Sequence, residues 1–87
     1  MTWSKLDIRQ ARKIALHPVL EKMGYRLRKL ERGNYLVEKH GSLVIKDNYW
    51  FWKENKLSGN AIDFFVIVEK RPFLEAINIL KGKKTNQ

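Results

Sequence analysis

The stretch Asn48–Phe65, NYWFWKENKLSGNAIDFF, decides the fold, because two structural periods meet within it. It contains six of the ten aromatic residues of the chain. The aromatic run from Tyr49 favours a β-strand, and a helical pattern begins after the Ser-Gly-Asn at 58–60. So much aromatic surface is typical of a hydrophobic core, of a platform for stacked bases, or of the remains of a metal site.

The second half of this stretch predicts a helix. Asn60 is a favourable N-cap, and Asp63 lies at the third helical position, where a carboxylate meets free N–H groups. The residues expected on one side of this helix are Ile62, Phe65, Val66 and Glu69. A last helix is expected to start at Pro72, with an apolar stripe of Phe73, Ala76, Ile77 and Leu80. Residues 82–87 are expected to form a disordered basic tail.

Towards the N-terminus, the pattern predicts two helices separated by a break. Ser4 is a suitable N-cap with Asp7 as its capping-box partner, and Leu6, Ala11, Ile14 and Ala15 recur at near-helical spacing. Pro18 disfavours helical geometry at His17, so the break is predicted there. A second, short helix with Val19, Leu20 and Met23 then ends at Gly24.

Between the helices the apolar period becomes two. Tyr25 and Leu27 alternate with Arg26 and Arg28, and Arg32-Gly33-Asn34 has the composition of a hairpin turn. Three further short runs follow: YLVEKH, SLVIK and YWFWK. The sequence therefore predicts an α+β domain over residues 1–81, in which a small antiparallel sheet of three or four strands is flanked by N-terminal and C-terminal helices.

Composition restricts the possible functions. Eighty-seven residues allow one core, and without cysteine there is neither a disulfide nor a thiolate zinc site nor a Cys nucleophile. No signal peptide or membrane span is recognisable, so a cytoplasmic location is expected. The formal net charge of +9 favours a polyanionic partner, with a solubilising surface as the alternative. No nucleophile–base pair or phosphate-binding glycine loop is present, so we expect no enzyme and no cofactor.

The motif SGNAIDFF, with GSLVI, HPVLEKMGY and the aromatic strand upstream, resembles the zinc-binding domain of bacterial replicative primases. It is more similar to the degenerate version at the N-terminus of LtrC-like, toprim-containing proteins of plasmids and conjugative transposons. The resemblance covers roughly residues 7–80. Its motif residues are Trp50, Trp52, Gly59, Asn60, Ile62, Asp63 and Phe64. It implies a zinc-ribbon-like fold in a replication or transfer protein.

The metal ligands of that family are missing. The first ligand pair falls around Val37 to His40 and the second approximately on Trp52 and Asn55, so no zinc is expected. Burial of Trp50 and Trp52, on one face of a strand, is expected to replace the metal. Tyr49 and Phe51 then lie on the opposite face and become the candidates for base stacking.

The expected function is binding of single-stranded DNA without catalysis. Sheet cations would hold phosphates; the residues predicted to bind nucleic acid are Arg26, Arg28, Lys29, Arg32, Lys39, Lys46, Tyr49, Phe51, Lys53 and Lys56. The alternative is a protein-interaction module that docks on a toprim or primase domain or on a helicase. Neither reading involves a membrane or a metal.

Overall fold

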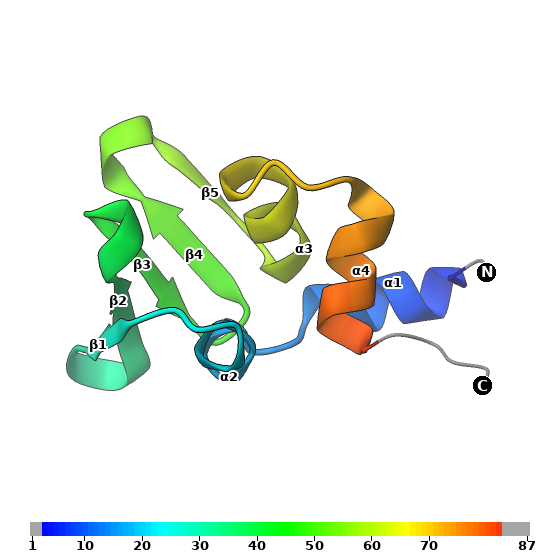
Figure 1. Ribbon diagram of the computed structural model, residues 1–87, viewed down its shortest axis with the longest axis horizontal. Coiled ribbons are helices and arrows are strands. Elements are labelled where there is room, and N and C mark those ends of the chain that lie inside the picture. Colours follow the sequence, from blue (N-terminus) through cyan, green and yellow to red (C-terminus); the bar gives the residue numbers. More distant parts are fainter. Residues whose placement is uncertain (1–2, 83–87) are drawn as a thin grey trace.

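The computed structural model describes residues 3–82, which contain a five-stranded antiparallel sheet and four α-helices (Figure 1). The strands are β1 (Leu27–Lys29), β2 (Asn34–Val37), β3 (Leu43–Lys46), β4 (Tyr49–Trp52) and β5 (Leu57–Gly59). The helices are α1 (Lys5–Arg12), α2 (Leu16–Lys22), α3 (Ala61–Asp63) and α4 (Phe73–Lys81). Three 3-10 turns, η1 (Glu31–Gly33), η2 (Glu38–His40) and η3 (Lys53–Asn55), join strands, and a π-helical turn, η4 (Phe64–Val68), continues α3. The predicted α+β class is confirmed.

The sheet is a meander in which each strand pairs with the next, in the order β1-β2-β3-β4-β5. Five strands form where three or four were predicted. The strand that was not predicted is β5, which overlaps the predicted Ser-Gly-Asn turn. Lys56 adopts the left-handed conformation (φ 54°) that closes the β4–β5 connection. Leu57 and Ser58 then pair with Trp52 and Phe51.

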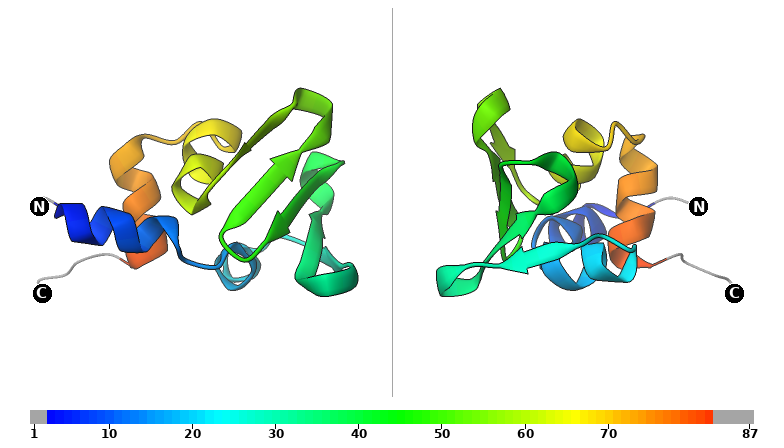
Figure 2. Two further views of the ribbon diagram at one scale, coloured as in Figure 1. Left: turned by 180° about the vertical axis from the view of Figure 1, so that it is seen from behind. Right: turned by 60° about the vertical axis from the view of Figure 1, so that its left-hand side comes forward.

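The helices cover one face of this sheet (Figure 2, right). On that face Val37, Leu43, Ile45 and Trp50 are completely buried. The ring of His17 in α2 also stacks on Tyr35 of β2, with 4.1 Å between the centroids. The alternation of side chains along the strands therefore leaves the other half of them on a face without helices.

The break between the first two helices was predicted at His17 but lies at residues 13–15. Ala15 is the N-cap of α2, so His17 and Pro18 both belong to its first turn. Proline is tolerated there, because the first N–H groups of a helix have no intrahelical acceptor. The Leu16 N–H instead donates to the Asp47 carbonyl oxygen in the β3–β4 turn (2.8 Å). The expected ending after α2 is confirmed, with Gly24 at φ +95°.

Both predicted N-caps are confirmed: Ser4 with Asp7, and Asn60 with Asp63, form complete capping boxes. The apolar stripe of α4 needs one correction. Ala76, Ile77 and Leu80 are buried as expected, but Phe73 is 44 % exposed, because it begins the helix beside Pro72 at its open end. On α1, Leu6 is likewise exposed (58 %), whereas Ala11 is buried. Of the predicted tail, residues 83–87 lie outside the described residues.

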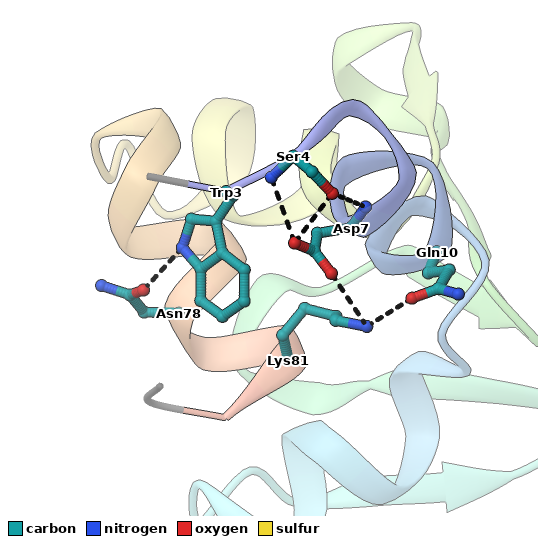
Figure 3. A network of polar contacts seen from close by, with 6 residues as sticks. All are labelled: Trp3, Ser4, Asp7, Gln10, Asn78 and Lys81. Carbon is teal, nitrogen blue, oxygen red and sulfur yellow. Dashed lines mark hydrogen bonds and ion pairs between the residues drawn. The ribbon is translucent and has the colours of Figure 1, made fainter. Parts of the chain in front are cut away.

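A polar network joins the two terminal helices (Figure 3). The buried Trp3 donates its indole N–H to Asn78 Oδ1 (2.9 Å). Lys81 Nζ donates to Gln10 Oε1 (2.7 Å) and lies 4.0 Å from Asp7 Oδ1. Trp3 was not among the predicted core residues, because it precedes the first helix and carries no periodic signal. These contacts hold α1 against α4.

Candidate nucleic-acid interface

Two aromatic side chains stand on the uncovered face of the sheet. Tyr49 and Phe51 alternate along β4 with the buried Trp50, and they are 54 % and 47 % exposed. Large aromatic side chains are usually at least half hidden in a domain core. Their position matches the expectation that these two residues, rather than the tryptophans, face away from the helices.

The strand register places cations and a small apolar floor beside the two rings. Lys46 lies directly opposite Tyr49, and Val44 lies opposite Phe51. Further across the sheet, Leu36 of β2 lies opposite Val44, and Arg28 of β1 lies opposite Leu36. The result is an open hollow of about 1080 Å³. Its lining residues are Lys29, Leu30, Glu31, Asn34, Val44, Lys46, Tyr49 and Phe51.

The cations of this face are not all equally available. Arg28 Nε lies 3.6 Å from Glu38 Oε2, and both side chains are largely exposed. Such a surface pair is worth about 0–1 kcal/mol, so a phosphate can displace the carboxylate. Lys46 has no ion pair among those found in residues 3–82. Lys46, which lies opposite Tyr49, is therefore available to bind an anion.

The remaining predicted cations lie around the rim of the sheet. Arg32 is in the β1–β2 turn, in the left-handed conformation (φ 59°), and Lys53 and Lys56 are in the β4–β5 turn. Lys39 lies in η2 with its ammonium 5.5 Å from the centroid of the Tyr25 ring. Arg26 precedes β1, whereas Lys29, the last residue of β1, lines the hollow although its backbone pairs with Tyr35. The structure thus gathers five of the ten predicted residues and distributes the others at the edges; the five are Arg28, Lys29, Lys46, Tyr49 and Phe51.

The motif from Trp50 to Phe64 builds the core instead of a ligand site. The Trp50 indole N–H donates to the Asn60 carbonyl oxygen (2.9 Å), and its ring packs edge-on against Phe64. Ile62 and Phe64 are buried. Gly59 has no room for a side chain, because a Cβ there would lie 2.6 Å from Asp63 Oδ2. These residue types therefore follow from packing and capping.

His40 and Trp52 pack against each other. The His40 ring lies edge-on against Trp52, with 5.3 Å between the centroids. Within residues 3–82, His40 Nε2 and Trp52 Nε1 are buried without a hydrogen-bond partner. Burial lowers the pKa of His40; the charge of Lys39 lowers it further, against an opposing effect of Glu69. Across residues 3–82, no three metal-ligating side chains cluster.

Sequence reasoning missed four lining residues of the hollow, namely Leu30, Glu31, Asn34 and Val44. The alternation of side chains was the available signal, because Leu30 follows Arg28 by two residues.

No helix within residues 3–82 is long and apolar enough to cross a membrane. No protein-family model, curated protein or solved structure matches the chain.

Proposed function

We propose that this chain binds single-stranded DNA on the open face of its sheet, as a non-catalytic domain of a primase-like protein of a mobile element. One observation carries the proposal. Two exposed aromatic rings, Tyr49 and Phe51, lie side by side on a sheet face that no helix covers, with Lys46 and Arg28 on the same face.

The aromatic rings supply the contacts to bases. Stacking of a base on an aromatic side chain contributes about 1–3 kcal/mol. Residues two apart on a strand are about 6.5 Å apart, roughly twice the 3.4 Å rise of a stacked nucleic-acid strand. Tyr49 and Phe51 therefore fit two successive bases of an extended strand. In a duplex the base faces are covered by their neighbours, which favours an unpaired strand as the ligand.

The cations supply the contacts to phosphates. Arg28 and Lys46 lie within the aromatic face, while Arg32, Lys53 and Lys56 stand in the turns at its two ends. About five phosphate contacts on a single strand would give a slope of log K against log[salt] near −3.5. The resemblance to primase domains favours DNA over RNA as the natural strand.

The direct test is fluorescence anisotropy of a labelled oligonucleotide of about ten nucleotides, within the range of sites on such surfaces. Tyr49→Ala/Phe51→Ala is expected to weaken binding by at least tenfold, since each lost stacking contact costs about 1–3 kcal/mol. Tyr49→Phe is the matched control, because it keeps the ring and removes only the hydroxyl. Wild-type binding that is undetectable, or that is unchanged in the double variant, would refute the proposal.

A second candidate function, docking on a protein partner, has one observation in its favour. Ile67, Phe73 and Leu74 are 37 %, 44 % and 56 % exposed on η4 and α4, away from the open sheet face. Large exposed apolar side chains are enriched in interaction surfaces. The partner would be the toprim or primase portion of the same system, or a helicase. Leu74→Glu separates the two functions, because it is expected to abolish such docking and to leave oligonucleotide binding unchanged.

A further inference from the structure

The outer face of α1 carries a second group of cations. Lys5, Arg9, Arg12 and Lys13 recur at helical spacing, so they share one side of the helix. All four are exposed, while Ala11 on the opposite side is buried. None of them takes part in the ion pairs found within residues 3–82.

The one acidic residue of α1 is directed away from this cationic face. Asp7 Oδ2 accepts hydrogen bonds from the backbone and hydroxyl of Ser4, and Asp7 Oδ1 lies 4.0 Å from Lys81 Nζ. Figure 3 shows this carboxylate directed towards α4. The outer face therefore presents positive charge without an intrahelical counter-ion, which is a surface suited to a polyanion.

The cationic face of α1 and the aromatic face of the sheet are linked through the β3–β4 turn. Asn48 Nδ2 donates to the Arg12 carbonyl oxygen (2.8 Å), so the end of α1 contacts the turn that separates Lys46 from Tyr49. Seen from behind, α1 lies in front of α4, with the β3–β4 turn between α1 and the body of the sheet (Figure 2, left). Asp47 is an acidic residue of this turn.

We propose that α1 holds the duplex part of a single-strand–duplex junction, whose unpaired strand continues over Tyr49 and Phe51. This inference rests on the proposed function of the sheet. A helix of eight residues is about 12 Å long, which spans roughly three phosphates of one strand. The face carries cations and no aromatic ring, so it makes phosphate contacts and suits the higher charge density of paired DNA.

The test compares two labelled ligands, a single strand of about ten nucleotides and a hairpin that carries the same strand as an overhang. The wild type is expected to bind the hairpin with overhang about tenfold more tightly at low salt. Arg9→Gln/Arg12→Gln is expected to remove this advantage and leave single-strand affinity within about twofold. The salt slope for the junction is expected to become shallower by about 1.8, because each duplex phosphate contact contributes about 0.9.

Matched variants separate position from total charge. Lys22→Gln/Lys70→Gln removes the same charge from the end of α2 and from the segment before α4, and is expected to change the junction preference little. Asp47→Asn removes a negative charge, and asparagine tolerates the left-handed backbone at this position (φ 53°). The variant is therefore expected to strengthen junction binding.

The outcomes distinguish this inference from the function on which it rests. If the wild type binds neither ligand, the proposed function itself fails. If the wild type binds the single strand and the hairpin equally, or if the α1 variant weakens both ligands equally, the duplex assignment is overturned. Loss of binding to phosphatidylserine-containing vesicles in the α1 variant, with junction binding intact, would also overturn it in favour of a membrane surface.

Discussion

The indole N–H of Trp50 donates a hydrogen bond to the carbonyl oxygen of Asn60 at 2.9 Å. This contact ties the middle of β4 to the N-cap of α3, the point where the strand pattern changes to a helical one. Because Trp50 is also completely buried, it joins the sheet to its covering helices both by packing and by a polar contact. The aromatic strand therefore has one face that stabilises the fold and one that remains free.

The two tryptophans of β4 are expected to respond differently to substitution. Trp50→Phe removes the donor to Asn60 and leaves a cavity, so it is expected to lower the free energy of unfolding by about 1–3 kcal/mol. Trp52→Phe, the matched variant, removes an indole N–H that has no partner within residues 3–82, so a change below about 1 kcal/mol is expected. Urea unfolding measures both, and equal losses would contradict the assignment.

Gly59→Ala is expected to destabilise the fold by about 1–2 kcal/mol. The new Cβ would meet the Asp63 carboxylate at 2.6 Å and displace it from the Asn60 N–H, which breaks the capping box. The neighbouring Ser58→Ala, at an exposed position of the same strand, is the control. Thermal unfolding that is unchanged in Gly59→Ala would show that Asp63 is not fixed as described.

The pKa of His40 predicts a loss of stability in mild acid. Burial lowers this pKa below its ordinary value of 6.5, so the unfolded chain binds the proton first as the pH falls. The free energy of unfolding is therefore expected to decrease as the pH falls below about 6.5.

His40→Phe tests this origin of the acid sensitivity. It removes the titrating group and the buried Nε2, and the ring still packs against Trp52. We expect it to be more stable by about 1 kcal/mol and less sensitive to pH between about 7 and 5. His17 is retained in both proteins, so an identical pH profile for wild type and variant would assign the sensitivity elsewhere.

Glu38→Gln is expected to strengthen binding of single-stranded DNA by about two- to fivefold at low salt. The substitution releases Arg28 from its surface partner and removes a negative charge beside the aromatic face. Glu75→Gln makes the same change in charge on α4, remote from the sheet face, and serves as the control. Equal effects of the two variants would indicate a response to net charge alone.

Several features could be predicted from neighbouring residues alone. Ser4 with Asp7 and Asn60 with Asp63 are separated by three positions, so the caps depend only on a local interaction. Gly24, after α2, follows from its permissive backbone. The alternation of Tyr49, Trp50 and Phe51 likewise fixed which side chains of β4 share a face.

The errors lie where distant contacts outweigh local preference. The chain is helical at His17 because Leu16 is held by Asp47, thirty-one positions away in sequence. β5 forms because its three residues complete a ladder on β4, although their composition favours a turn. Phe73 belongs to the apolar stripe in the sequence, but it is exposed at the first residue of α4.

The sequence by itself determined the α+β class, the caps and the two faces of the aromatic strand, because these depend on interactions between residues a few positions apart. The tertiary structure alone decided that no described helix covers the face of Tyr49 and Phe51. It also decided which cations join them, bringing Arg28 and Lys46 to the open face and placing the end of α1 against the β3–β4 turn. The physical reason is that these arrangements arise from many weak contacts between distant segments, whose sum no local pattern records.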